Sequence, residues 1–195
     1  MPVPEETPDE SPPAWTVEGD EVVVHGRIFD VHKVRARSPR TGQRHEFTRI
    51  VSPDWVNIIP LTPEGGVVMV RQFRHGTREL TLEIPGGTVD PGEAPEVAAA
   101  RELREETGYA AEAAVEALGA VTPNPALFDN RCHSYLARDV RRVDRIRNEG
   151  AEETAVEIHA LADVPRLIRE GEITHALVIA AFHWLALHEN GLGDG

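Results

Sequence analysis

One stretch of the chain, residues 83–109, limits what the protein can fold into more than any other part of the sequence. It contains a tight turn with two consecutive glycines, Gly86 and Gly87, and then an alanine-rich run that ends at Gly108. Proline is tolerated at the start of a helix, and glycine is the usual residue at its end. We therefore expect a helix over residues 95–107, directly behind the glycine turn.

Three glutamates recur on this predicted helix at helical spacing. Glu105 and Glu106 follow Glu102 by three and four residues, so all three carboxylates should lie along one side of the helix. Like charges this close destabilise a helix unless a cation lies among them, and Mg²⁺ is a cation that prefers oxygen ligands. The alternative is an ordinary solvated acidic face.

The residues before and after these glutamates also have a definite spacing. The fixed positions are Gly87, Glu93, Arg101, Glu102, Leu103, Glu105, Glu106, Gly108 and Tyr109. This spacing resembles the Nudix box, G-x5-E-x7-R-E-U-x-E-E-x-G-U, in which U is bulky and apolar; Tyr109 stands where an aliphatic residue is commoner. The resemblance favours a metal site over a solvated acidic face.

The resemblance to the Nudix family implies a fold and a set of roles. The implied fold is α+β, an α/β/α sandwich around a mixed sheet. The implied metal ligands are Glu102, Glu105, Glu106 and the backbone carbonyl of Gly86, with Mg²⁺ as the ion and Mn²⁺ as a possible substitute. Glu93 and Arg101 are expected to join the loop to the helix.

The chain is expected to fold as one domain with an added N-terminal piece. Residues 1–20 are rich in proline and acidic residues, and we interpret them as a mobile tail. Residues 21–54 contain short β-branched runs separated by turn residues, which are typical of antiparallel strands. Residues 55–190 form the Nudix domain, and residues 191–195 a C-terminal tail. The resemblance implies that the N-terminal piece forms a homodimer.

Strands and helices elsewhere are predicted from periodicity. Residues 112–121 are expected to form a strand because apolar residues alternate there, although alanine favours a helix. Two helices finish the chain, and we expect Asp163 and Thr174 to cap them. An arginine-rich segment, residues 138–147, is expected to be a solvated loop, with a phosphate contact as the alternative.

The sequence before the glycine turn resembles the ADP-ribose pyrophosphatase branch of the family, with R-Q-F-R-H-G from residue 71 and L-E-I-P-G-G from residue 82. Arg71 and Arg74 are then candidates to bind the substrate diphosphate, because a guanidinium meets phosphate oxygens two at a time. Strand alternation should turn one of them away from the site, and we expect Arg71 to be the binding one. Glu83 is a candidate for a metal ligand or a ribose contact.

Further candidates come from loops and exposed aromatics. The resemblance implies a loop glutamate as general base, either Glu152 or Glu153, in addition to Glu105 as a catalytic residue. Phe29 or Trp55 is a candidate to stack on adenine. Asn124 lies in a substrate loop whose Asn-Pro-Ala departs from the Ser-Pro-Gly of many such members, which leaves the leaving group open.

Charge and cysteine content exclude some classes of partner. The formal net charge of −13 argues against binding nucleic acid or an acidic membrane, because both require a basic surface. A small anionic substrate remains compatible, since bound metal inverts the local charge. The one cysteine, Cys132, cannot form an internal disulfide, which favours a reducing, cytoplasmic location.

The predicted function is Mg²⁺-dependent hydrolysis of a nucleoside diphosphate linked to another group, with ADP-ribose as the first candidate. Another nucleotide sugar, NADH or a dinucleoside polyphosphate is the alternative within the same reaction class. A non-catalytic ligand sensor with the same fold is the alternative of a different class, although members of that kind usually lose the box carboxylates. None of those carboxylates is missing here.

Overall fold

The computed structural model describes residues 11–147 and 153–191 of the 195-residue chain. It divides into two compact units, which we describe separately. The N-terminal unit contains the chain up to Ser52 together with Ala126–Asp129, and the main unit contains Pro53–Pro125 and the chain from Asn130 onward. Residues 1–10 of the predicted tail at residues 1–20, as well as residues 192–195 of the C-terminal tail, lie outside the described residues.

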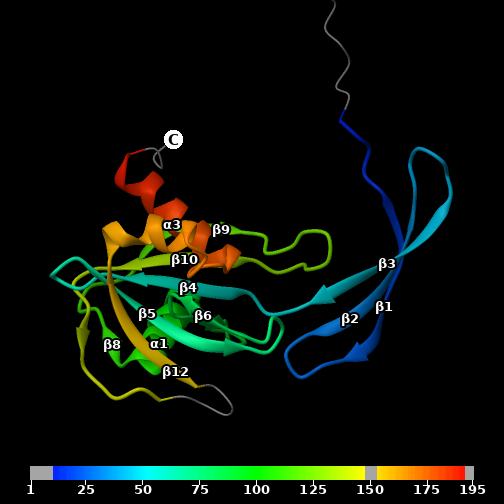
Figure 1. Cartoon of the computed structure of the whole chain (residues 1–195). Helices are drawn as coiled ribbons and strands as arrows, with labels where there is room; N and C mark the ends of the chain where they lie inside the picture. Colours follow the sequence, from blue (N-terminus) through cyan, green and yellow to red (C-terminus); the bar gives the residue numbers. More distant parts are fainter. Residues whose placement is uncertain (1–10, 148–152, 192–195) are drawn as a thin grey trace, which may run out of the picture. The chain divides into compact units, whose positions relative to one another are not determined.

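The N-terminal unit is a three-stranded antiparallel sheet in the order β1-β2-β3 (Figure 1). Its strands are β1 (Thr16–His25), β2 (Asp30–Arg37) and β3 (Arg44–Val51). The prediction of antiparallel strands in this region is confirmed. The prediction that residues 16–20 belong to the tail is wrong, because pairing with β2 holds them in a strand despite their polar composition.

The described residues of the main unit, 53–125, 130–147 and 153–191, form nine strands in three sheets. They are β4 (Trp55–Pro60), β5 (Gly66–Arg74), β6 (Glu79–Glu83), β7 (Gly86–Thr88), β8 (Tyr109–Ala110), β9 (Glu116–Val121), β10 (Cys132–Ala137), β11 (Arg141–Arg142) and β12 (Thr154–Ala160). The sheet orders are β7-β4-β10-β9, β11-β8 and β12-β5-β6, and the β4–β10 pair is parallel while the other pairs are antiparallel. The strand predicted over residues 112–121 begins only at Glu116.

The helices are α1 (Pro95–Thr107), α2 (Val164–Arg169) and α3 (Ala176–Glu189), with a 3₁₀ turn before α2 (Leu161–Asp163). The predicted helix is confirmed, and Gly108 ends it in a left-handed conformation with φ of 74°. The predicted caps are wrong. Asp163 makes no side-chain cap bond, and α3 is capped by His175, not Thr174: its Nδ1 accepts the N–H of Leu177 at 3.2 Å.

Helices cover both faces of the strands in the main unit (Figure 1). One cluster packs Met69 and Leu82 of the sheet against α2 and α3. The other packs Val68 and neighbouring strand residues against Ala98, Ala99 and Leu103 of α1. Because side chains alternate along a strand, each residue of β5 and β6 belongs to either the α1 face or the α2–α3 face.

The described part of the chain contains no helix with the length and apolar character needed to span a lipid bilayer.

Candidate active site

The glycine turn lies directly against the carboxylate-bearing side of α1. Gly86 and Gly87 form most of β7 and pair with Asn57 and Val56 of β4. A Cβ atom at Gly87 would stand 2.3 Å from Oε1 of Glu102, and one at Gly86 would stand 2.4 Å from the carbonyl oxygen of Val56. These positions therefore require glycine because of close approach, since neither has a positive φ.

Glu106 is the most deeply placed carboxylate of the three. Glu106 is 5 % exposed, and its Oε2 accepts a hydrogen bond from the backbone N–H of Gly86 at 3.0 Å. This bond joins the end of α1 to the turn that carries the predicted carbonyl ligand. The structure thus brings Glu106 and Gly86 together, as a shared metal site requires.

Arg101 holds the other acidic residues of the box. Its guanidinium donates to both carboxylate oxygens of Glu93 at 3.0 Å, to the carbonyl of Thr88 at 3.1 Å, to Glu102 at 2.8 Å and to Glu105 at 3.1 Å. The pKa of Arg101 is raised, first by its bonds to Glu93 and then, against the opposing effect of burial, by those to Glu102 and Glu105. The loop and helix are therefore joined by the pair that the sequence predicts.

The donor chemistry suits a hard divalent cation. Glu102, Glu105 and Glu106 supply only carboxylate oxygens, which Mg²⁺ and Mn²⁺ prefer over nitrogen or sulfur. No three acidic, histidine or cysteine side chains converge on one point among residues 11–147 and 153–191, and Arg101 occupies oxygens of two of the three glutamates. The residues present fit such an ion by their chemistry, with Arg101 as the cation that balances two of them here.

A buried ion pair lies on the α1 face of the neighbouring sheet. Glu83 is directly opposite Val70, and Arg74 shares this face by alternation along β5. Arg74 donates to the two oxygens of Glu83 at 2.8 and 2.7 Å, and the hydroxyl of Thr81 adds a bond of 2.6 Å. Burial by itself raises the pKa of Glu83, which is 2 % exposed, but Arg74 and Thr81 outweigh burial and lower it.

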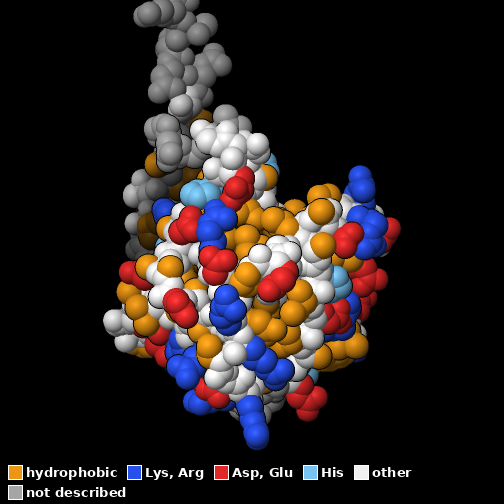
Figure 2. Space-filling model, turned by 90° about the vertical axis from the view of Figure 1, so that its left-hand side faces the viewer, with side chains coloured by type: hydrophobic (Ala, Val, Ile, Leu, Met, Phe, Trp, Pro, Cys, Tyr) orange, Lys and Arg blue, Asp and Glu red, His pale blue; other side chains and the backbone are white. Residues whose placement is uncertain are grey.

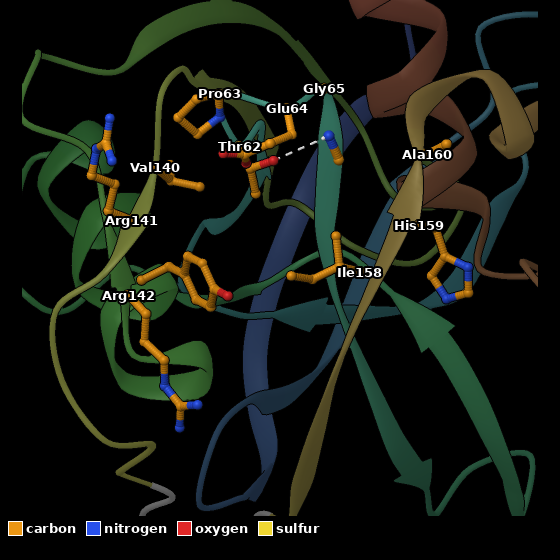
Figure 3. Close-up of a pocket in the computed structure, with 12 residues that line it drawn as sticks. Thr62, Pro63, Glu64, Gly65, Val140, Arg141, Arg142, Ile158, His159 and Ala160 are labelled. Carbon is orange, nitrogen blue, oxygen red and sulfur yellow. Dashed lines mark hydrogen bonds between the residues drawn. The ribbon is translucent and has the colours of Figure 1, made fainter.

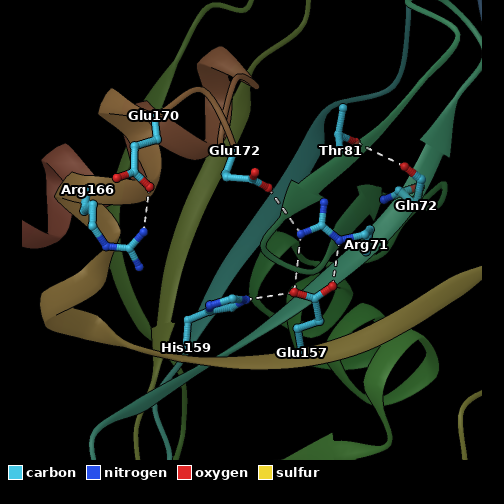
Figure 4. Close-up of polar contacts among 8 residues, drawn as sticks. All are labelled: Arg71, Gln72, Thr81, Glu157, His159, Arg166, Glu170 and Glu172. Atoms are coloured by element: carbon cyan, nitrogen blue, oxygen red, sulfur yellow. Dashed lines mark hydrogen bonds and ion pairs between the residues drawn. The ribbon is translucent and has the colours of Figure 1, made fainter.

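Arg71 lies on the opposite face from Arg74, as alternation along the strand predicts. It shares the α2–α3 face with Met69, where Nε donates to Glu157 at 2.6 Å and Nη2 lies 3.5 Å from Glu172 (Figure 4). These acids raise the pKa of Arg71, the largest cause being the bond to Glu157. The choice of Arg71 as the diphosphate ligand stays a prediction, but the structure places Arg74, and not Arg71, on the face that packs against α1.

The remaining predicted residues are scattered. Glu153 is exposed and precedes Thr154, whose hydroxyl donates to the carbonyl of Glu106 at 3.1 Å; Glu152 lies outside the described residues. Trp55 is half-buried at the start of β4, and Asn124 is an exposed loop residue. Phe29 belongs to the N-terminal unit and is 40 % exposed. The substrate roles of these residues stay predictions.

Sequence reasoning missed the contacts at the C-terminal end of α1. Arg147 donates its backbone N–H to the carbonyl of Glu105 at 2.8 Å, and Asp144 binds Arg104 of α1 through its side chain at 3.2 Å. The arginines of this segment are exposed, as expected, but the segment is also fixed to α1 by these two contacts. Figure 2, which views the left-hand side of Figure 1, shows basic side chains interspersed with acidic ones on that face. Only the charge alternation of this segment could have indicated the contact.

A cavity of about 440 Å³ lies beside this segment, between β12 and the β8–β11 pair. Tyr109 and Ile158 line it together with Thr62, whose hydroxyl accepts the N–H of Gly66 (Figure 3). None of the predicted metal, catalytic or substrate-binding residues lines it, although Arg141 and Arg142 of the arginine-rich segment do. The cavity is therefore separate from the box carboxylates.

Comparison with known proteins agrees with this geometry. The NUDIX domain matches residues 51–182. This chain is a member of the Nudix family. It is therefore a Nudix hydrolase that acts on diphosphate anhydrides, a family that generally uses divalent metal ions, and the predicted family, fold class and enzyme class are confirmed.

Individual relatives of this Nudix hydrolase match over most of their length. It is 31 % identical over 171 residues to an ADP-ribose pyrophosphatase of Bacillus subtilis strain 168, covering 87 % of this chain and 91 % of the relative. It is 30 % identical over 170 residues to a methanol dehydrogenase activator of Bacillus methanolicus, with the same coverage of 87 % and 91 %. A crystal structure of an ADP compounds hydrolase superposes with a TM-score of 0.81 at 24 % identity, covering 95 % of this chain and 100 % of that one, which shows the shared fold.

Proposed function

We propose that this Nudix hydrolase cleaves ADP-ribose to AMP and ribose 5-phosphate with Mg²⁺. The observation that carries the proposal is the contact of the glycine turn with the box carboxylates. The N–H of Gly86 donates to Glu106, and Gly87 lies so close to Glu102 that a Cβ atom there would clash with its carboxylate. The Bacillus subtilis relative, named an ADP-ribose pyrophosphatase, supports the choice of substrate.

In this proposal the glutamates of α1 bind the metal ion and Arg101 positions two of them. Glu102, Glu105 and Glu106 would hold the divalent ion together with the carbonyl oxygen of Gly86. A bound divalent ion neutralises the charge of a diphosphate and lowers the pKa of a water molecule that it holds. Arg101 keeps Glu102 and Glu105 on one side of the helix through its two bonds to them. A chelator should abolish hydrolysis, and added Mg²⁺, or Mn²⁺ as a substitute, should restore it.

Arg74 is the residue that we propose to bind the diphosphate. It lies on the α1 face, and its two bonds to buried Glu83 fix the plane of its guanidinium. A fixed planar fork suits phosphate oxygens, which it can bind two at a time. Glu83 then acts by orienting Arg74, which replaces the predicted ribose or metal contact as the better-supported role.

We propose a loop carboxylate, Glu153 or Glu152, as the base that takes a proton from the attacking water. Support comes from Thr154, because its bond to the carbonyl of Glu106 ties the residue after Glu153 to the last turn of α1. Glu153→Gln and Glu152→Gln should be assayed singly and together. If the double variant turns over as fast as the wild type, neither residue is the base.

The deciding experiment is product analysis in heavy-oxygen water over a panel of diphosphates with Mg²⁺. The panel should contain ADP-ribose, another nucleotide sugar, NADH and a dinucleoside polyphosphate. Glu106→Gln should lose nearly all turnover while remaining folded, because the amide oxygen can still accept the Gly86 N–H but no longer carries charge. Glu96→Gln, an exposed change on the same helix, is the matched control and should be fully active.

Each outcome of this panel has a defined meaning. Fast turnover of another nucleotide sugar with poor turnover of ADP-ribose would overturn the substrate and keep the reaction class. Cleavage of no member would overturn the proposal and favour a non-catalytic binding role. The label position in AMP and ribose 5-phosphate also identifies the phosphorus attacked.

We further propose that the N-terminal unit forms a homodimer. Its three-stranded sheet exposes Trp15, Val17 and Phe47 by 45, 62 and 46 %, and Trp15 makes an edge contact with Phe47 at 5.3 Å. A sheet this thin needs a further packing partner for stability, and a second copy supplies a matching apolar face. Phe47→Glu should convert a dimer to a monomer in analytical ultracentrifugation, whereas a monomeric wild type would overturn the proposal.

A cytoplasmic location is the last part of the proposal. Its support is Cys132, the only cysteine, which is buried and has a thiol pKa raised by burial to about 12. A single buried thiol forms no internal disulfide, so the fold does not depend on an oxidising compartment. Detection of the native protein in a secreted or membrane fraction, and not in the cytosol, would contradict this assignment.

A further inference from the structure

The last turn of α1 has partners for backbone groups that helices normally leave unpaired. The final carbonyls of a helix have no partner within it. Here the carbonyl of Arg104 accepts from Gly108 at 2.9 Å, that of Glu105 from the N–H of Arg147 at 2.8 Å, and that of Glu106 from the hydroxyl of Thr154 at 3.1 Å. Two consecutive metal-box residues are thus held from outside the helix.

Asp144 is the centre of these contacts. One of its carboxylate oxygens, Oδ2, accepts Arg104 of α1 at 3.2 Å and Arg147 at 2.6 Å, and the other accepts the N–H of Arg145 at 2.8 Å. Its backbone N–H donates to the carbonyl of Gly108 at 3.0 Å. One side chain therefore fastens the segment that carries Arg147 to the helix that carries Glu105.

Gly108 and the backbone of Asp144 are packed so closely that neither can shift without moving the other. A Cβ atom at Gly108 would stand 2.3 Å from the carbonyl oxygen of Asp144. The bond from Arg147 to Glu105 is made by backbone atoms, so its position depends on how the 144–147 segment is held, not on a flexible side chain. Shifting Asp144 must therefore shift the contact on Glu105.

Electrostatics give the same contact a second purpose. The C-terminal end of a helix carries partial negative charge, so a carboxylate there is disfavoured. Glu105 and Glu106 both lie in that last turn. Arg104 and Arg147, gathered by Asp144, place positive charge at the same end and offset this effect.

We propose that Asp144 is a positioning residue for hydrolysis. It sets the place of the Glu105 carboxylate through Arg104 and through the backbone bond from Arg147, and it touches neither substrate nor metal. The proposal rests on the function proposed above, because it assigns Asp144 a role in that reaction. We call the contacts of Asp144 with Arg104 and with the Arg147 segment the Asp144 clamp. Displacing a reacting group by about 1 Å costs on the order of a hundredfold in rate, so loosening the clamp should lower kcat.

The test compares Asp144→Asn with Glu170→Gln as the matched control. The control removes an exposed ion pair on α2, between Glu170 and Arg166 at 2.6 Å, far in sequence from the box. For Asp144→Asn we expect kcat to fall by roughly tenfold to a hundredfold with KM within about twofold, and the thermal midpoint to match that of the control. An unchanged kcat, or a loss of activity equal to the control's, would overturn the proposal.

Two further measurements separate positioning from simple stability. In a double-mutant cycle, Asp144→Asn combined with Arg147→Gln should be no slower than either single variant, because both remove the same clamp. Hydrogen exchange at the Arg147 amide should become faster in Asp144→Asn, and unchanged exchange would overturn the clamp. This readout needs no activity, so a wild type that cleaves no diphosphate refutes the proposed function while leaving the clamp testable.

Discussion

Gly87→Ala tests the contact on which the site depends. An added Cβ atom would stand 2.3 Å from Oε1, 2.5 Å from Cδ and 2.9 Å from Oε2 of Glu102, whereas ordinary contact begins at 3.4 Å. The carboxylate must therefore retreat by 3.4 − 2.3, or about 1.1 Å. It cannot do so freely, because Arg101 holds it at 2.8 Å.

The backbone itself tolerates alanine at this position. Gly87 is not among the glycines with positive φ, so the variant should keep its fold and change the free energy of unfolding by less than about 1 kcal/mol. Catalysis should respond much more strongly. A displacement of about 1 Å corresponds to a loss of roughly a hundredfold, or about 2.7 kcal/mol, in kcat/KM.

The assay is kcat/KM for ADP-ribose with Mg²⁺, measured beside thermal unfolding of the same samples. Gly76→Ala is the matched control, because a Cβ atom there has nothing within 4 Å and the residue has no positive φ. We expect the control to be fully active. A folded Gly87→Ala protein with wild-type kcat/KM would refute the idea that Glu102 is held in place against the glycine turn.

Three other predictions concern stability and reactivity. Arg74→Leu should lower the free energy of unfolding by about 3 kcal/mol at neutral pH, because it leaves Glu83 buried without its cation. Because the pKa of Glu83 is lowered, its stabilising contribution is complete above its ordinary value of 4.5 and is lost only as pH falls through the lowered value. Without Arg74, burial raises the pKa of Glu83. The gap in urea unfolding between wild type and variant should therefore be largest at neutral pH and close only well below pH 4.5, and a gap independent of pH would contradict the pairing. Gly108→Ala should destabilise the protein by more than about 1 kcal/mol in urea unfolding, because φ is 74° and Asp144 blocks the Cβ position; a neutral effect would show that this end of α1 is loose. Cys132 should react with a thiol reagent only after unfolding, since burial raises its pKa to about 12, and rapid reaction of the native chain would contradict its burial.

Local features of the site were predictable from the sequence. The helix over residues 95–107 and its end at Gly108 depend on proline and glycine conformations, which are properties of single residues. The contact between Glu93 and Arg101 was implied by the resemblance to the Nudix box. Strand prediction was weaker over residues 112–121, where alternation indicated a strand and the structure forms one only from Glu116.

Features that depend on long-range packing were not predictable. Alternation along β5 required Arg71 and Arg74 to point to opposite faces, but only the packing of α1 decided that Arg74 lies on its side. His175, and not Thr174, caps α3, because the helix begins one residue later than expected. The clamp of Asp144 on Arg104 spans residues that are distant in the chain and share no local pattern.

The sequence by itself determined which chemistry is available and on which element it is carried. Helical periodicity places Glu102, Glu105 and Glu106 on one side of α1 whatever the helix packs against, because that periodicity is set by the backbone alone. Tertiary structure decided which groups face those carboxylates. Gly86 on Glu106, Arg74 on the α1 face and Arg147 on Glu105 all depend on how separate strands and segments pack, and no spacing along the chain encodes those contacts.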